Sequence, residues 1–206
     1  MATAASLLTS IPTSQEWKDL LEDIVPAQGE WSEELYLALT DHGNRLIEFT
    51  DGFLEALPMP TDKHQCILEY LYFAFSHFIK PRGGKAHIAP VRLRIRPKKF
   101  REPDIMLLLS ATDERRQNRF WLGADLALEV ASEDKPERDL IDKRGDYAEA
   151  HVPEYWIVNP QTDAITVLRL QGDCYQEAGI YRRGQIAASV LMPEFAVAVD
   201  EVFNAD

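Results

Sequence analysis

Two acidic residues lie within strongly apolar stretches of the chain. Asp104 begins the sequence Asp-Ile-Met-Leu-Leu-Leu directly after Pro103, and Glu129 lies inside Leu-Ala-Leu-Glu-Val-Ala. A carboxylate within a buried strand is costly unless it is paired, hydrogen-bonded or bound to a cation. If the two strands are adjacent, the two carboxylates form a pocket of hard oxygen ligands suited to Mg²⁺ or Mn²⁺. The alternative is structural: an aspartate that caps a loop and a glutamate that pairs with an arginine.

The basic residues are unevenly distributed along the chain. Nine of the 22 lysines and arginines, and none of the 34 acidic residues, fall between Lys80 and Arg101. Three arginines in this basic band alternate with aliphatic residues, which in a strand would place three guanidinium groups on one side. These three are Arg92, Arg94 and Arg96. The pattern predicts a face that binds an anion such as nucleic-acid phosphate. The alternative is an edge strand whose charges prevent aggregation.

The elements that must position these residues can be predicted from periodicity. Apolar residues at helical spacing predict an amphipathic helix over Asp62–Ile79. Other helices are expected at Ser14–Val25, Trp31–Leu39 and Asp139–Ala150, and a hairpin at Arg45–Thr50 and Gly52–Leu57. Further strands are expected at Ala86–Ile95, Asp104–Leu109, Leu126–Ala131, Tyr155–Val158, Ile165–Leu170, Cys174–Ala178 and Gln185–Ser189.

This order of elements predicts the fold class. Strands alternate with helices in the middle of the chain and pair as hairpins at both ends, which indicates an α/β (mixed α+β) fold with a mixed central sheet flanked by helices. The length of 206 residues favours one domain over residues 1–206, with 1–44 as a lead-in with helices and 45–203 as the core.

Composition excludes several classes of protein. Cys66 and Cys174 lie far apart, which argues against a disulfide scaffold and a cysteine-rich zinc site. Met1–Gln15 has no basic residue ahead of an apolar stretch, which argues against a secretory signal peptide. Apolar runs such as Ile105–Leu109 are too short to cross a bilayer. We therefore expect a soluble cytoplasmic protein without a membrane partner. The net charge of −12 argues against a non-specific coat on nucleic acid.

Several motifs resemble those of a known nuclease superfamily. Pro103-Asp104, Glu129-Val130-Ala131 and a lysine on the following helix are similar to the PD-(D/E)XK nucleases. More narrowly, the chain resembles the Uma-two family of restriction endonucleases from about Arg45 to Phe203. The motifs that carry this likeness are Leu46–Gly52, Pro58, His64, Leu128–Ser132, Asp139, Lys143, Tyr147 and Val152–Pro160.

The resemblance implies a function and a set of roles. It implies a metal-dependent endonuclease that hydrolyses DNA and acts as a homodimer, with Mg²⁺ or Mn²⁺ held by Asp104, Glu129 and the backbone carbonyl of Val130. Glu48 could add a carboxylate from the first hairpin. In such a site the metal lowers the pKa of a bound water and stabilises charge on the scissile phosphate.

The sequence departs from the superfamily motif at one position. Ala131 stands where Glu-x-Lys has its lysine, and in the family the lysine is expected from the next helix. Lys143 lies four residues before Tyr147, so the two share one helical face. Lys143 would orient the attacking water or neutralise phosphate charge. Its alternative is a surface lysine that pairs with Asp139.

Other interpretations stay open at this point. His64, Ser132 and Tyr147 are more simply explained by structural roles than by catalytic ones. Two other functions also fit the chain: a catalytically inactive nucleic-acid-binding or assembly module of the same fold, and a hydrolase of small phosphate esters. Because one fold supports many functions, only the geometry of the site can separate them.

Overall fold

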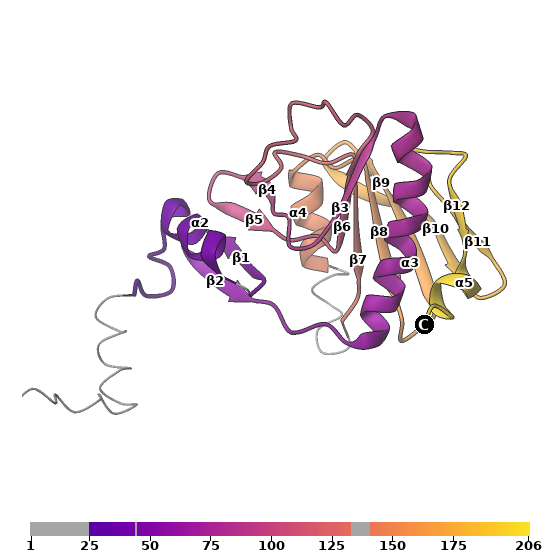
Figure 1. The fold of residues 1–206 in the computed structure, drawn as a ribbon, viewed down its shortest axis with the longest axis horizontal. Helices are drawn as coiled ribbons and strands as arrows, with labels where there is room; N and C mark the ends of the chain where they lie inside the picture. The colour runs from indigo at the N-terminus through magenta and orange to yellow at the C-terminus, as the bar shows by residue number, and fades with distance from the viewer. Residues whose placement is uncertain (1–24, 44, 133–140) are drawn as a thin grey trace, which may run out of the picture.

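The computed structural model describes residues 25–43, 45–132 and 141–206, and the strands among them form three sheets (Figure 1). The small sheet has the order β2-β1-β5-β4 and comprises β1 (Ile47–Thr50), β2 (Phe53–Ala56), β4 (Leu93–Arg96) and β5 (Lys99–Arg101). The large sheet has the order β10-β9-β8-β7-β6-β3 and comprises β3 (Lys85–Ile88), β6 (Ile105–Leu108), β7 (Leu126–Val130), β8 (Glu154–Asn159), β9 (Ala164–Gln171) and β10 (Cys174–Arg182). The third sheet pairs β11 (Ile186–Ala188) with β12 (Ala196–Ala198).

The centre of the large sheet is buried on both faces. Every residue of β6 and β7 is buried, which explains why these strands appear in the sequence as unbroken apolar runs. β7 and β8 pair in parallel, whereas the other strand pairs of this sheet are antiparallel. The predicted mixed sheet flanked by helices is therefore confirmed.

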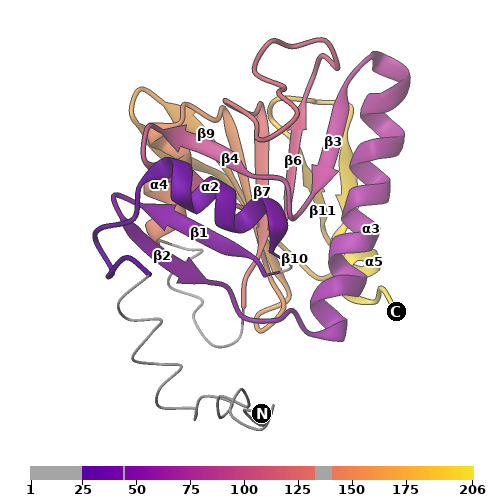
Figure 2. The ribbon, with the colours of Figure 1, turned by 60° about the vertical axis from the view of Figure 1, so that its left-hand side comes forward.

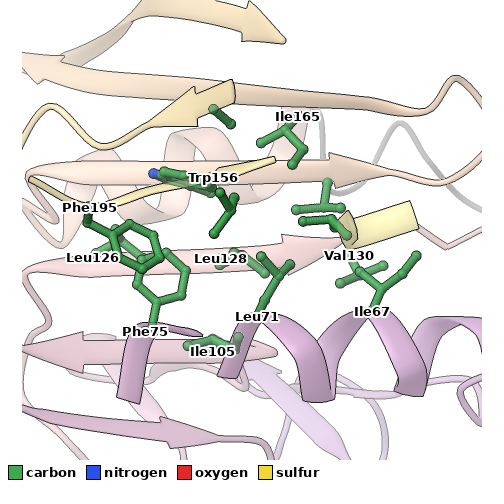
Figure 3. Packing of buried hydrophobic residues seen from close by; sticks show 14 of the residues in the cluster. Ile67, Leu71, Phe75, Ile105, Leu126, Leu128, Val130, Trp156, Ile165 and Phe195 are labelled. Carbon is green, nitrogen blue, oxygen red and sulfur yellow. The ribbon is translucent and has the colours of Figure 1, made fainter. Parts of the chain in front are cut away.

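Helix α3 (Asp62–Ile79) covers one face of the large sheet. Its first turn is capped by Thr61, whose side chain accepts a hydrogen bond from the backbone of His64. Ile67, Leu71 and Phe75 point from α3 onto the strands, as Figure 3 shows. The short helix α5 (Val199–Phe203) contributes to the same core. The predicted bounds of α3 are confirmed.

The opposite face of the large sheet is covered by α4 (Lys143–Glu149) and β4. Tyr147 of α4 is fully buried there with Leu93 and Trp121. Helix α2 (Glu33–His42) packs through Tyr36 on Phe49 and Phe100 of the small sheet. Figures 1 and 2 show α2, β1 and β2 at one side of the molecule and α3 at the other. Helix α4 thus lies between the two larger sheets.

The predicted turn of the first hairpin is confirmed at Asp51-Gly52. Both residues have positive φ, of 48° and 94°, which is the conformation that a two-residue hairpin turn requires. A Cβ atom on Gly52 would lie 2.3 Å from the carbonyl oxygen of Gly29, whose own N–H donates to Gly52 O at 2.8 Å. Glycine is therefore required both by the turn and by the close approach of a second chain segment.

Several predicted bounds were wrong. The single strand expected at Ala86–Ile95 is two strands in different sheets, β3 and β4, separated by a turn that contains Pro90. Strand β5, strand β12 and helix α5 were not predicted at all. The helix expected at Ser14–Val25 lies almost wholly outside the described residues, as does the start of the one expected at Asp139–Ala150. In the described part of the chain, the helices are too short or too polar to span a membrane.

Candidate metal and catalytic site

A cavity of about 630 Å³ brings the predicted site residues together. It lies where β6 and β7 approach the first turns of α3 and α4. Its lining includes Asp104, Glu129, Val130, Ser132, His64 and Lys143, together with apolar residues from the 56–60 segment. The register of β6 and β7 pairs Ile105 with Leu128, so the next step along the ladder sets Asp104 opposite Glu129. Two carboxylates from adjacent buried strands therefore face one hollow.

Asp104 is fixed by two donors. The backbone N–H of Val130 donates to its Oδ2 at 2.8 Å, and His64 Nε2 lies 3.2 Å from the same oxygen. Asp104 and His64 side chains are each 16% exposed, so the pair is at the wall of the cavity. Across the described parts of the chain, every contact of Asp104 uses Oδ2. The other oxygen, Oδ1, is left for a ligand.

Glu129 is held by two side chains of α4. Lys143 Nζ lies 2.7 Å from Oε2, and the hydroxyl of Tyr147 donates to Oε1 in a short hydrogen bond. The side chains of Glu129 and Lys143 are only 3% and 6% exposed. Burial and the charge of Glu129 raise the pKa of Tyr147 well above its ordinary value, so Tyr147 stays protonated and acts as a donor. The predicted shared face of Lys143 and Tyr147 is confirmed by their common partner.

Glu48 reaches the same cluster from the small sheet. It is almost fully buried on β1, 3.9 Å from Lys143 Nζ and 3.5 Å from Arg101 Nε. The backbone N–H of Glu102 also donates to Glu48 Oε1 at 3.3 Å. Lys143 therefore lies between two buried carboxylates that come from different sheets. Its burial contradicts the surface location assumed in the alternative, and Asp139, the partner expected there, lies outside the described residues.

Glu102 is a buried acid that the sequence analysis missed. Its Oε2 has no hydrogen-bond partner among the residues that the structure describes. Burial is the main cause, and the nearby charge of Glu48 the second, of a rise in its pKa to about 8. The only sequence signal was its place one residue before the Pro103-Asp104 motif.

The other face of α4 is held by the basic band. Asp146 forms ion pairs with Lys99 and with Arg101 Nε, the latter at 2.6 Å. Glu149 forms ion pairs with Lys99 Nζ at 2.7 Å and Arg96 Nε at 2.8 Å. Helix α4 is thus clamped between β5 and β7, and this clamp sets the position of Lys143.

The three arginines expected to bind nucleic acid all pair with carboxylates of this chain. Arg92 lies 2.6 Å from Asp41, Arg94 lies 3.0 Å from Glu33, and Arg96 lies 2.6 Å from Asp51. None of the three lines the 630 Å³ cavity. β4, which carries Arg94 and Arg96, is an edge strand of the small sheet. Binding of the three arginines to nucleic acid stays a prediction, and the edge-strand alternative describes the position of Arg94 and Arg96 in the sheet.

The donor set fits a hard divalent cation. The described residues contain no cluster of three His, Cys, Asp or Glu side chains able to hold a metal, so an ion here would use two carboxylates, backbone oxygen and water. Mg²⁺ is commonly bound in this way, because it keeps several of its waters. The open Oδ1 of Asp104 and the several lone pairs of a carboxylate leave room for such an ion beside Lys143 and Tyr147.

Comparisons with known proteins identify the family and the fold. A family model with the description "Putative restriction endonuclease", named Uma2, matches residues 33–200. Among solved structures, a "putative nuclease belonging to DUF820" from Anabaena variabilis superposes with a TM-score of 0.69 and 18% identity, over 86% of this chain and 98% of that one. That likeness shows the fold. No curated protein matches the chain. Because the family model spans most of the sequence, the chain belongs to the Uma2 family of restriction-endonuclease-like proteins.

Proposed function

We propose that this protein is a metal-dependent endonuclease that hydrolyses phosphodiester bonds in DNA. The observation that carries the proposal is the convergence of Asp104, Glu129 and Lys143 on one cavity, with the lysine supplied by α4 instead of the Glu-x-Lys position. Asp104, Glu129 and the carbonyl of Val130 would hold Mg²⁺ or Mn²⁺. A bound divalent ion supplies an acidified water and stabilises charge on the scissile phosphate.

The residues of the chain have distinct tasks in this mechanism. Tyr147 and Lys143 hold Glu129 in one orientation, and His64 with the Val130 N–H does the same for Asp104. Lys143 is among the residues that line the cavity, and its ammonium group would orient the attacking water or offset negative charge on the phosphate. Glu48 flanks Lys143 from the opposite side and fixes its direction.

Metal binding and cleavage test the proposal together. Mn²⁺ should raise the melting temperature of the wild-type protein and leave that of Glu129→Gln unchanged, because ligands stabilise only the state that binds them. Cleavage of DNA should require Mg²⁺ or Mn²⁺ and be lost in Glu129→Gln and in Lys143→Met. Arg144→Met, on the same helix but outside the cavity lining, serves as the control. Metal-independent cleavage, or full activity of Lys143→Met, would contradict the proposed roles.

Two observations favour a second candidate, a binding or assembly module that has lost turnover. Both oxygens of Glu129 are already contacted, by Tyr147 and by Lys143, and position 131 is alanine. A protein of this kind would bind DNA without cleaving it, and Mn²⁺ would not change its melting temperature. The two measurements above therefore separate the candidates.

The proposal includes the setting in which the enzyme acts. We propose a cytoplasmic homodimer, because two-fold symmetric dimers are the commonest assemblies of soluble proteins. Cys66 and Cys174 are both free thiols, as a reducing compartment requires. Light scattering of the purified protein at micromolar concentration measures the oligomeric state directly.

A further inference from the structure

The lining of the cavity contains, besides the carboxylates, a run of apolar residues, Leu57–Pro60, which we call the apolar wall. The chain segment between β2 and α3 contributes Leu57, Pro58, Met59 and Pro60 to the lining. Met59 is 87% exposed, which is unusual for a large apolar side chain and places it at the entrance. Leu46, Leu68 and Ile88 extend the same apolar surface. A ligand in this cavity would therefore bury apolar groups while its reacting group lies beside Asp104 and Glu129.

The basic side chains that line the cavity are engaged within the protein. Lys63 Nζ donates to the carbonyls of Phe203 at 2.6 Å and Ala205 at 3.0 Å. Lys143 pairs with Glu129, and His64 contacts Asp104. The described lining thus offers little positive charge to a row of phosphates.

The basic band is engaged in the same way. Six of its nine members form ion pairs with carboxylates of this chain: Arg82, Arg92, Arg94, Arg96, Lys99 and Arg101. A duplex binds proteins mainly through phosphate contacts, each of which adds to the salt dependence of binding. With a net charge of −12 and two thirds of the band paired, the residues that the structure describes present few uncompensated cations for such contacts.

The size of the cavity points to a smaller unit of nucleic acid. Its volume of about 630 Å³ lies within the range of about 300–1,000 Å³ typical of pockets that enclose small ligands. An unpaired nucleotide exposes its base and sugar, which can pack on an apolar wall, whereas a paired nucleotide keeps its base stacked inside the helix.

We propose that the cavity takes one or two unpaired nucleotides of a DNA strand, with base and sugar against the Leu57–Pro60 wall and the phosphate beside Asp104 and Glu129. The substrate is then single-stranded DNA or an unpaired segment, bound by apolar burial more than by phosphate contacts. This inference deepens the proposed function and rests on it for the identity of the reacting group.

Binding measurements separate this inference from the proposed function. A fluorescein-labelled 12-nucleotide strand with phosphorothioate linkages, which resist cleavage, is titrated with the full-length protein in Mg²⁺, alone and as its duplex. The single strand should bind at least tenfold tighter, and its affinity should fall with salt at a slope that corresponds to about one or two phosphate contacts. Tighter binding of the duplex, a slope of about six contacts or more, or no binding of either form would overturn the inference.

Two exposed apolar residues provide matched variants. Met59→Ser should weaken binding of the single strand about fivefold to tenfold, because Met59 lines the cavity. Phe73→Ser removes an apolar side chain that is 60% exposed and outside the lining, and it should leave binding unchanged. Equal effects of the two changes would contradict the apolar wall.

Cleavage of unmodified DNA is measured separately. Binding of the single strand without cleavage supports the inference and contradicts the proposed nuclease function. Preferred cleavage of duplex DNA supports the nuclease function and contradicts the inference.

Discussion

Asp104 shows how a half-buried carboxylate can be prepared for a ligand. Both of its donors contact Oδ2, and one of them, His64, comes from the first turn of α3, forty residues away in sequence. Partners of this kind orient ligating groups and commonly change metal affinity by about 10–100-fold when they are removed. We therefore propose a positioning role for His64, which its isolated place in the sequence did not indicate.

Replacement of His64 tests this role. His64→Ala should weaken Mn²⁺ binding about tenfold or more, measured by titration calorimetry, because Asp104 loses one of its two donors. His64→Gln keeps an N–H donor and should retain most of the affinity. Gln65→Ala changes a neighbouring residue of the cavity lining and serves as the control. Equal affinity in the wild type and His64→Ala would show that the contact is structural only.

Glu102 ties stability to pH. Its pKa is raised from 4.5 to about 8, so between these values the folded state keeps a proton that the unfolded state has released. By linkage, the free energy of unfolding then falls as pH rises through this window, which is the opposite of the usual effect of a paired carboxylate. The penalty is fully relieved below about pH 4.5 and is greatest at and above the folded-state pKa.

Glu102→Gln should remove this dependence, because glutamine resembles the protonated acid. We expect the variant to be more stable than the wild type by roughly 2–4 kcal/mol at pH 8 and by almost nothing at pH 4.5. Urea denaturation at a series of pH values, with a chelator present, measures both free energies. If the variant and the wild type differ in free energy of unfolding by the same amount at every pH, Glu102 is ionised in the folded protein at neutral pH.

At the scale of elements, α4 connects the small sheet to the candidate site, because it contacts both. Arg101 of β5 contacts both Asp146 of α4 and Glu48 of β1, and its side chain is 13% exposed. The side chains of Lys143 and Tyr147, on the same helix, contact Glu129. Removal of the guanidinium group would leave two buried carboxylates with fewer cationic partners, and this is strongly destabilising in proteins.

Arg101→Met should therefore lower the free energy of unfolding by about 3–5 kcal/mol. The matched control is Arg183→Met, since Arg183 pairs with Asp163 at 2.6 Å but is 41% exposed. Solvent screens such a pair, so the control should cost less than about 1 kcal/mol. Similar losses in the two variants, measured by urea denaturation, would contradict the clamp.

The elements that sequence predicted well are those with a long or uniform pattern. Helix α3 has 18 residues with regular apolar spacing, and β6 and β7 are wholly apolar apart from the site glutamate. The error at Ala86–Ile95 had a signal that was not used: Pro90 cannot donate to a ladder and breaks a central strand. Strands β5 and β12 have three residues each, too few for a period to show.

The candidate site was partly predictable for the same reason. Asp104 stands out because it begins an apolar run and Glu129 because it interrupts one, and their strands prove to be neighbours. The contacts of Lys143 with Glu48, and of His64 with Asp104, join residues 95 and 40 positions apart. No local pattern encodes such pairs, because they depend on how the two sheets and α4 pack.

At the scale of the whole molecule, the basic band serves mainly to hold acidic elements in place. Arg92 donates to Thr40 and Asp41 at 2.6 Å each, and Asp41 also pairs with Arg119 at 2.7 Å. These bonds join the end of α2 to the chain that leads into β4. The cluster of arginines in the sequence therefore corresponds to a network of internal ion pairs. The net charge of −12 comes from acidic residues elsewhere in the chain.

Arg92→Met distinguishes this structural role from direct binding to DNA. Arg92 is 10% exposed, and loss of its charged hydrogen bonds should lower the free energy of unfolding by about 2–3 kcal/mol. The affinity for a single-stranded oligonucleotide, measured well below the melting temperature, should stay within about twofold of wild type, because a residue without phosphate contacts leaves the salt slope unchanged. A uniform loss of affinity across sequences, with a slope smaller by about one contact, would instead place Arg92 on the DNA backbone. Arg119→Met, which removes the more exposed partner of the same Asp41, should cost less stability and likewise leave affinity unchanged.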